Sequence, residues 1–386
     1  MISPLRSSRR MATVAVAIGL LGACAILVVL VESPGGGSGV VRRTSLALKA
    51  GPLGRQHKRV STPSPDATTP ADRTGLRLMT EATAACGSVA FQGSQRSVWW
   101  GPASASASVL QVWHRPGGSI LAQPSDTEGD PVGESQVNPD ALSDQDDAIN
   151  LTASLLTLMR AHYVLRYTGT GSVAGRAAQI VEVRRHDGSL AARFWLDTGT
   201  KLPLRRELLN ASGQMFSEDT FLSLSVGSRQ LHGMPAADAQ PWTGRLTAGS
   251  LAALRAQGWS LPATVPGGMA LFTSTQMSTK SGKVVELSYS DGLSVISVFE
   301  QRGELPRTMP GWRRISARGS SVYAIDPDDR SLAWSSRGFV YTVISDAPAA
   351  AVDGVVSRLP HDRTPDFWGR MDRGLHRIAS WANPFG

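Results

Sequence analysis

The stretch from Val164 to Leu224 constrains the fold of this chain more than any other part of it. It holds five short runs of β-branched, aromatic and aliphatic residues, separated by clusters of turn-forming residues. The Asp187-Gly188 pair between two runs is typical of a tight hairpin, because such turns need residues with positive φ. Apolar and polar residues alternate within the runs, as in Val181-Glu182-Val183, which favours an antiparallel sheet with one face toward a core. We therefore expect a meander that acts as the scaffold of a domain.

The chain is long enough for more than one domain. It has 386 residues, and hydrophobic residues make up 41% of it, enough for sizeable cores. Charged residues make up only 18%, whereas Gly and Pro are common, and this balance favours strands and loops over long surface helices. The sequence therefore predicts two domains built mainly on sheets.

The basic charge does not indicate a nucleic-acid-binding protein. A net charge of +8 and a pI near 10 suit either nucleic acid or an anionic membrane surface. The sequence has no helix-turn-helix pattern and no Lys/Arg run with interleaved aromatic residues. We expect no nucleic-acid partner and interpret the charge as a solvated basic surface close to anionic lipid.

The N-terminus favours a membrane anchor. Three arginines precede an uncharged run from Met11 to Val31, which as a helix would match a hydrocarbon core of ~30 Å. The basic flank places the N-terminus inside, so the bulk of the chain would lie outside the cytoplasmic membrane on a single-pass anchor. The alternative is a lipoprotein anchored at Cys24, because Leu21-Gly22-Ala23-Cys24 resembles a lipoprotein cleavage box.

Neither a disulfide framework nor a metal site is expected. The chain has two cysteines, and Cys24 lies in the hydrophobic N-terminal run, so Cys86 has no partner. Cys86 shares one face of a predicted helix with Leu76, Met79 and Thr83, which favours a core residue over a reactive thiol. The histidines are scattered, with no pair at ligand spacing, and no metal or cofactor is predicted.

Two further helices are expected to cover the sheets. Ser143 with Asp146 resembles a variant capping box, and the helix that follows would place Leu151, Leu155, Leu158 and Met159 on one side. Near the C-terminus, Asp346 is a candidate cap for a helix that faces a second sheet. That sheet includes another tight hairpin at Asp291-Gly292.

The composition shifts along the chain divide it into seven segments. The tail carries aromatic and aliphatic residues on one flank and basic residues on the other, which fits a helix on an anionic bilayer or a helix docked on the C-terminal domain. The expected segments are a cytoplasmic N-terminus (1–10), an anchor (11–31), a flexible tether (32–73), an N-terminal domain (74–227), a linker (228–250), a C-terminal domain (251–360) and an amphipathic tail (361–386).

No catalytic constellation is recognisable. Gly169, Gly171 and Gly175 superficially resemble a dinucleotide fingerprint, but a strand follows them instead of the helix that would hold the pyrophosphate. There is no Gly-x-Ser-x-Gly elbow, and the paired acidic residues Asp328-Asp329 sit in turn sequence. We expect a protein that is not an enzyme.

The aromatic residues of the first domain are the candidate ligand-binding residues. On the concave side of a curved sheet they would line an apolar cavity for an acyl chain, whereas core packing is the ordinary role of strand aromatics. The candidates are Phe91, Trp99, Trp100, Trp113, Phe194 and Trp195.

Several phrases of the sequence resemble the RseB/MucB family of extracytoplasmic regulators of sigma-E-type transcription factors. The resemblance covers roughly Leu76 to Pro360 in two blocks. Its carrying residues are Ser88–Gly93, Val112–Arg115, Gly175–Ala178, Arg193–Gly199 and Leu202–Glu207 in the first block and Tyr289–Phe299 in the second.

The resemblance implies an α+β fold with a large N-terminal domain similar to the lipoprotein carriers LolA and LolB. That domain would be a curved antiparallel half-barrel sheet covered by helices, preceded here by the transmembrane helix and followed by a smaller α/β C-terminal domain. Family members bind the extracytoplasmic domain of an anti-sigma factor and protect it from proteolysis, and lipid-like ligands release them. In this chain Tyr289, Asp291 and Phe299 of the C-terminal hairpin are the candidate partner-binding residues.

The expected function is that of a membrane-anchored stress-response regulator that binds an anti-sigma factor, modulates its proteolysis and senses a lipid or lipoprotein. The alternative is a lipid or lipoprotein carrier of the LolA/LolB type. The anchor, the long tether and the amphipathic tail depart from the family pattern and fit a membrane-tethered version.

Overall fold

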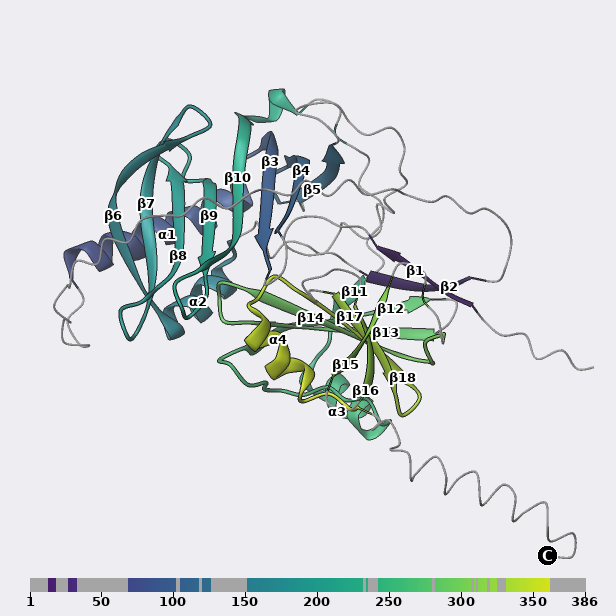
Figure 1. The fold of residues 1–386 in the computed structure, drawn as a ribbon. Coiled ribbons are helices and arrows are strands. Elements are labelled where there is room, and N and C mark those ends of the chain that lie inside the picture. Colours follow the sequence, from purple (N-terminus) through teal and green to yellow (C-terminus); the bar gives the residue numbers. More distant parts are fainter. Residues whose placement is uncertain are drawn as a thin grey trace, which may run out of the picture.

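Two eight-stranded antiparallel sheets make up most of the structure, a computed structural model shown in Figure 1. It describes residues 13–18, 27–32, 69–101, 105–117, 120–125, 151–231, 234, 242–279, 282–306, 309, 312–317, 320–324 and 331–361. Among these residues four α-helices accompany eighteen strands. The predicted α+β class is therefore confirmed.

The first sheet contains the meander that the sequence predicts. Its strand order is β5-β4-β3-β10-β9-β8-β7-β6, and every neighbouring pair is antiparallel. Gly188 has a φ of +85° in the turn between β7 and β8, as the Asp-Gly signal predicts. The five predicted runs are confirmed as β6 to β10. The strands are β3 (Phe91–Trp100), β4 (Ala105–His114), β5 (Ile120–Ser125), β6 (Tyr163–Val173), β7 (Arg176–Arg185), β8 (Leu190–Asp197), β9 (Pro203–Leu209) and β10 (Met215–Val226).

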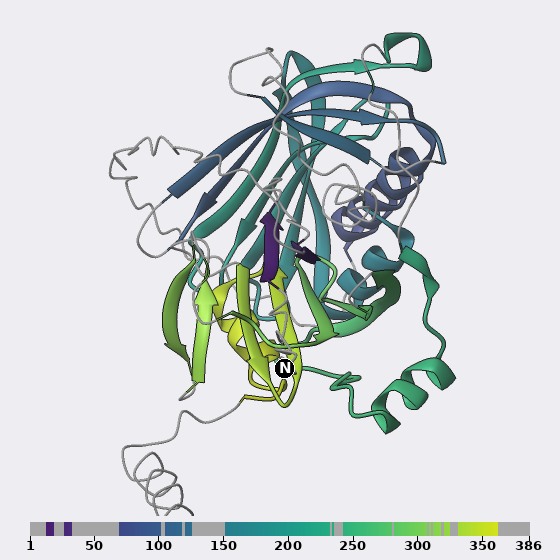
Figure 2. The same cartoon turned by 90° about the vertical axis from the view of Figure 1, so that its right-hand side faces the viewer.

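Two helices cover one face of this sheet, which we call the inner face (Figure 2). Helix α1 (Pro70–Ser88) begins earlier than the predicted domain boundary, because Thr69 and Asp72 form a capping box around its first turn. Helix α2 (Ala153–His162) is capped by Thr152, and the predicted cap at Ser143 and Asp146 lies outside the described residues. The helices pack Leu78, Met79, Ala82, Leu156 and Met159 against the sheet.

The second sheet has the order β11-β12-β13-β14-β18-β17-β16-β15. Helices α3 (Ala248–Ala256) and α4 (Ala349–Val356) pack on one of its faces, where Leu251, Leu254, Val352 and Val355 join a core with Trp334 and Tyr341. The strands are β11 (Trp242–Arg245), β12 (Ala270–Thr279), β13 (Gly282–Ser290), β14 (Val295–Arg302), β15 (Arg313–Ala317), β16 (Ser320–Ala324), β17 (Ser331–Ser336) and β18 (Phe339–Ser345).

Three predictions about the second domain need correction. The domain is not an α/β unit, since all described strand pairs of its eight-stranded sheet are antiparallel. The predicted linker 228–250 contains a short 3₁₀ helix, η2 (Ser228–Gln230), and strand β11, so the second sheet begins at Trp242. Asp346 does not cap α4, whose N-cap is Pro348.

The N-terminal segment differs from the predicted helix. Within Met11–Val31 the structure has strands β1 (Thr13–Ile18) and β2 (Leu27–Glu32), paired antiparallel. Both strands are rich in β-branched valine, which lowers helix propensity and favours extended backbone. In the described part of the chain no helix is both long and apolar enough to cross a membrane. Most of the predicted tether and nearly all of the predicted tail lie outside the described residues.

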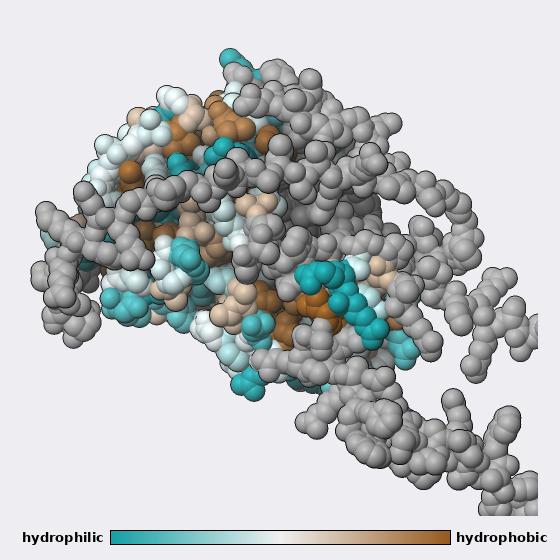
Figure 3. Space-filling view, in the orientation of Figure 1, coloured by the Kyte–Doolittle hydropathy of each residue, from teal (hydrophilic) through white to brown (hydrophobic). Residues whose placement is uncertain are grey.

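The surface mixes hydrophobic and hydrophilic areas over both sheets (Figure 3). Within the described ranges Leu222, beside a bulge in β10, is the exposed large hydrophobic side chain. The large apolar side chains therefore lie mainly in the cores, and the described surface offers no extended apolar patch of them.

Candidate functional site

The candidate aromatic residues divide between the two faces of the first sheet. Side chains alternate along a strand, so neighbours such as Trp99 and Trp100, or Phe194 and Trp195, cannot point to the same side. Phe91, Trp99 and Phe194 lie on the inner face. Trp100, Trp113 and Trp195 lie on the outer face, so a single cavity lined by all six is excluded.

On the inner face the aromatic side chains mostly fill the core. Trp99 packs edge-on against Phe216 with ring centroids 5.2 Å apart. Phe91 packs in the same way against Phe221 at 5.9 Å. Of the six candidates, Phe194 also belongs to the lining of the pocket described below. Core packing is therefore the dominant role of these residues.

The outer face of the first sheet carries a ladder of alternating charges. Trp195 lies within it, with the guanidinium carbons of Arg193 and Arg205 at 5.7 and 4.8 Å from its ring centroid. The carboxylates are nearly buried, whereas the guanidinium groups stay about one-third exposed or more. The ladder runs across five strands as Arg184, Glu182, Arg193, Glu207, Arg205, Glu218 and Arg96.

The ion pairs of the ladder lower the pKa of one of its carboxylates, that of Glu182. Burial would raise the pKa of Glu182, but hydrogen bonds from Arg184 and Arg193 outweigh it and the pKa is lowered. Each carboxylate of the ladder is shared by two arginines from neighbouring or nearby positions. The outer face is therefore a polar, cross-linked surface, and it explains why Trp195 is not available to an inner cavity.

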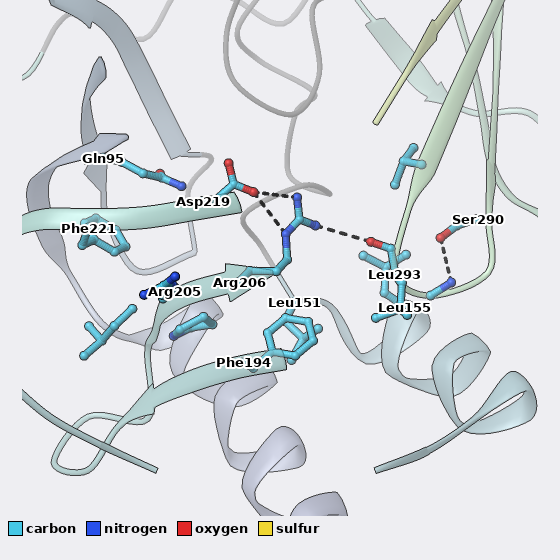
Figure 4. Close-up of a pocket in the computed structure, with 14 residues that line it drawn as sticks. Gln95, Leu151, Leu155, Phe194, Arg205, Arg206, Asp219, Phe221, Ser290 and Leu293 are labelled. Carbon is cyan, nitrogen blue, oxygen red and sulfur yellow. Dashed lines mark hydrogen bonds and ion pairs between the residues drawn. The ribbon is translucent and has the colours of Figure 1, made fainter. Parts of the chain in front are cut away.

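A pocket lies on the inner face where the two sheets meet (Figure 4). The hollow takes in about 560 Å³ if the space open to solvent is counted, but its enclosed part is only about 40 Å³, room for a few water molecules, so a larger ligand must extend into the open part. Its walls come from α2 and from Leu151, which lies just before the N-cap of that helix, from β3, β8, β9 and β10, and from the hairpin of β13 and β14. Most of these residues are apolar. The principal ones are Leu151, Leu155, Phe194, Leu204, Phe221, Leu293 and Val295.

A buried arginine joins the two sheets beside this pocket. Arg206 of β9 is 9% exposed, and its Nε and Nη2 donate to Asp219 Oδ2 of β10 at 3.2 and 2.8 Å. Its Nη2 also lies 3.4 Å from Asp346, which follows β18, and its Nη1 donates to the Leu293 carbonyl oxygen at 3.4 Å. One guanidinium thus binds groups from both sheets, and removing it would leave buried carboxylates behind.

The hairpin turn between β13 and β14 docks onto α2. A Cβ on Gly292 would lie 2.3 Å from the backbone nitrogen of Met159, so only glycine fits this close approach. The Tyr163 hydroxyl donates to Asp291 Oδ2 at 2.6 Å, and burial together with the Asp291 charge raises the pKa of Tyr163. Leu293 joins the core of the first sheet. The hairpin therefore fixes one sheet against the other.

The three candidate partner-binding residues have structural roles. Tyr289 is fully buried and donates to the Pro262 carbonyl oxygen at 2.6 Å, so its side chain belongs to the second core and is not at a surface. Phe299 is also buried, on the opposite face of the second sheet. Asp291 is half-buried and caps the turn by accepting from the backbone nitrogens of Leu293 and Ser294. Partner binding by these residues stays a prediction.

The titratable groups outside the pocket are mostly structural. Burial raises the pKa of Cys86 to about 11, and the thiol packs in the core of the first sheet as predicted. In the second core, burial raises the pKa of Glu300 to about 7, although the carboxylate accepts from Ser260 N and Tyr341 Oη. Across the described ranges no group of three or more His, Cys, Asp or Glu is placed to hold a metal ion.

Sequence reasoning missed the polar residues of the pocket. Gln95, Arg206 and Asp219 lie on strands where alternation predicts apolar inner positions, and nothing local distinguishes them from outer-face residues. A usable signal was parity, because Arg206 lies between Arg205 and Glu207 in β9, with Leu204 and Leu208 on its own side. A charged residue at an inner position of a buried strand is a candidate for a paired, functional role.

Comparison with known proteins gives a family match over part of the chain. Residues 134–243 match the model of the MucB/RseB N-terminal domain. The search of curated proteins found no match. Several solved structures are similar to this chain. The Pseudomonas aeruginosa MucA/MucB complex is 21% identical and covers 76% of this chain and 99% of that chain, with a TM-score of 0.42. A structure of MucB in complex with MucA(peri) is 22% identical, with the same coverage and a TM-score of 0.41.

A putative outer membrane lipoprotein-sorting protein domain from Vibrio parahaemolyticus is 11% identical and covers 42% of this chain and 95% of that chain, with a TM-score of 0.21. At TM-scores below 0.5 none of these likenesses supports a conclusion about this chain. The family match spans α2, β6 to β10 and η2, which includes the meander that dominates the sequence. The resemblance to the MucB/RseB family that the sequence predicts is thereby confirmed for this segment.

Proposed function

We propose that this protein is a regulatory binder that holds the extracytoplasmic part of an anti-sigma factor and modulates its proteolysis. The family match over residues 134–243 supports the regulatory role. The observation that carries the proposal is the pocket between the sheets, because its walls come from both of them. A ligand in this position contacts both halves of the molecule at once, so its binding free energy depends on how the halves are arranged.

The contacts around the pocket supply the link between ligand and partner. Gly292, Leu293 and Val295 line the pocket, and the same hairpin docks on α2 through the Gly292 backbone. A ligand that inserts here displaces or tightens that hairpin. The second sheet would then present a different surface to the anti-sigma factor, which is the change that a sensor needs.

The test measures partner binding with and without an apolar ligand. The full chain is immobilised and titrated with the extracytoplasmic part of the anti-sigma factor, and the protease sensitivity of that part is followed in parallel. We expect saturable binding and protection, both weakened by extracted membrane lipid. Failure to bind under every condition would refute the regulatory function.

A lipid or lipoprotein carrier of the LolA/LolB type is the second candidate function, and the apolar lining of the pocket favours it. A carrier moves lipid between membranes, whereas a regulator only responds to it. Transfer of a labelled lipid from donor to acceptor vesicles by the full chain separates the two. Catalytic transfer at low protein concentration, without anti-sigma binding, would favour the carrier.

We also propose that the chain is attached to the cytoplasmic membrane with its bulk outside. The support is the uncharged run Met11–Val31 behind three arginines, read from the sequence. Strands β1 and β2 occupy part of this run in the structure, so the helix itself finds no support there. Recovery of the full chain in the membrane fraction after alkaline washing is expected, and its recovery in the soluble fraction would refute the attachment.

A further inference from the structure

One side chain in the pocket is left with an unmet hydrogen-bonding need. Gln95 lies on the inner face of β3, where it pairs in register with Phe221 of β10 and Leu110 of β4. It is 2% exposed, and its Oε1 is buried without a hydrogen-bond partner. Figure 4 places its amide beside Asp219 and Phe221, at the edge of the pocket. Buried polar atoms of this kind are rare, because each loses its bonds to water without replacement.

The neighbouring polar groups are already satisfied. Asp219 accepts from Ser97 Oγ through Oδ1 and from Arg206 through Oδ2. Ser290 Oγ donates to the Ser294 carbonyl oxygen at 2.7 Å and accepts from Gly292 N at 2.9 Å. In the described structure neither Asp219 nor Ser290 forms a hydrogen bond with the side chain of Gln95. The amide is therefore the polar group that a ligand in the pocket would meet.

Arg205 also borders the pocket, and its Nε has no partner either. Its side chain, however, belongs to the outer face, where its Nη2 donates to Glu207 and Glu218 at 2.6 and 2.7 Å. It cannot reach the apolar interior without breaking both ion pairs. Gln95 is thus the better-placed group to recognise a head group inside.

We propose that this pocket binds a short apolar chain that ends in a hydroxyl or an amide, with Gln95 as the residue that selects the head group. Leu151, Leu204 and Leu293 and the two phenylalanines supply the apolar wall. A hydroxyl or amide both donates and accepts, so it satisfies Gln95 in either orientation of its side-chain amide. This inference rests on the proposed sensing function and names the chemical class of its ligand.

A carboxylate head fits the site less well. With the Gln95 amide oriented as in the structure, a carboxylate has no proton to donate to the unpartnered Oε1. In the described structure two carboxylates, Asp219 and Asp346, already surround the Arg206 guanidinium, so a further negative charge meets an occupied cation. The competing prediction is that Arg206 attracts an acid, and the two predictions give opposite orders of affinity.

The test compares octan-1-ol, octanamide and octanoate, which share one chain length, by NMR titration of the full chain. We expect the alcohol and the amide to bind about tenfold more tightly than the acid, the factor that one well-formed buried hydrogen bond supplies. Gln95→Leu should abolish this preference while retaining binding of the apolar chain. Gln111→Leu is the matched control, because Gln111 pairs with Ser94 on the outer face of the same sheet.

Every outcome of this titration either supports or refutes the head-group preference. Equal affinities for the three probes, tighter binding of octanoate, or an unchanged preference in Gln95→Leu would overturn the proposal. Gln95→Met provides a second variant if the leucine protein does not fold. Partner binding is measured separately, so a protein that binds its anti-sigma factor but shows no head-group preference would overturn this inference and leave the regulatory function standing.

Discussion

Replacing Glu300 by glutamine is expected to stabilise the protein at pH 8 and to change its stability little near pH 4. Glu300 is 1% exposed in the second core, between Ser260, which follows α3, and Tyr341 of β18. Burial raises its pKa from 4.5 to about 7, against the opposing effects of the hydrogen bonds from Ser260 and Tyr341 and of the Arg302 charge. At pH 8 the folded protein must therefore hold a buried carboxylate, whereas the glutamine variant does not.

The sign and size of this effect on the free energy of unfolding follow from the pKa values of Glu300 in the folded and unfolded states. Because the folded pKa lies above the unfolded one, the contribution of Glu300 is fully present below about pH 4.5 and is lost as the pH rises through about 7. The difference corresponds to about 3 kcal/mol at ~1.36 kcal/mol per pH unit. Glutamine keeps a carbonyl acceptor for Ser260 N and has no charge, so it removes this loss.

The assay is urea unfolding at pH 4, 6, 7 and 8, followed by tryptophan fluorescence, since Trp259 and Trp334 lie in the same core. At each pH the free energy of unfolding of wild type is subtracted from that of Glu300→Gln. This subtraction is needed because carboxylates with lowered pKa values, such as Glu182 and Asp197, make the stability of both proteins rise with pH, opposite to the effect of Glu300. Exposed Glu304→Gln is the control. A difference that stays constant from pH 4 to 8 would refute the reasoning.

Three further predictions concern the hairpin, the ladder and the outer tryptophan. Gly292→Ala should loosen the contact between the two sheets, because the added Cβ would collide with the Met159 backbone. The expected signs are a larger radius of gyration in X-ray scattering and faster proteolysis. Gly188→Ala is the control, because Gly188 has a similar positive φ but open space around it, so this variant should lose only about 1 kcal/mol of stability through local strain. Glu207→Gln should cost about 1 kcal/mol in urea unfolding, less in 1 M salt, since its arginine partners are one-third exposed; a salt-independent cost would contradict the ion-pair explanation. In a variant that keeps only Trp195, fluorescence should not shift on adding an octyl ligand, and a shift would place the ligand on the outer face.

Sequence patterns predicted the meander well because its physics is local. Alternation, hairpin glycines and turn clusters act within a few residues, and β6 to β10 follow the predicted runs closely. The same patterns gave the wrong start for α1, where Thr69 and Asp72 form a capping box that the tether prediction overlooked. For Met11–Val31 hydropathy favoured a helix, whereas its valines equally suit the strands that are found.

The candidate site was predicted only in part, for a geometric reason. Listing Phe194 with Trp195 ignored that a strand sends consecutive side chains to opposite faces, and applying that rule would have removed three of the six candidates. The pocket itself depends on contacts between residues far apart in the sequence, such as Arg206 with Leu293. No pattern within β9 or within the β13–β14 turn encodes such a contact.

The contact of the β13–β14 hairpin with the first sheet also explains how a pocket exists although the aromatic side chains of that sheet are tightly packed. Phe91 and Trp99 fill the inner face beneath α1 and α2, so a closed core would leave no space for a ligand. The space arises where the helices end and the β13–β14 hairpin takes over the covering, with Leu293 entering the first core from the second sheet. A core completed by a hairpin from another domain can open when that hairpin moves, whereas a core completed by its own helices cannot do so without unfolding. Sensing is therefore expected at the junction and not under the helices, which is where Gln95 keeps its unsatisfied oxygen.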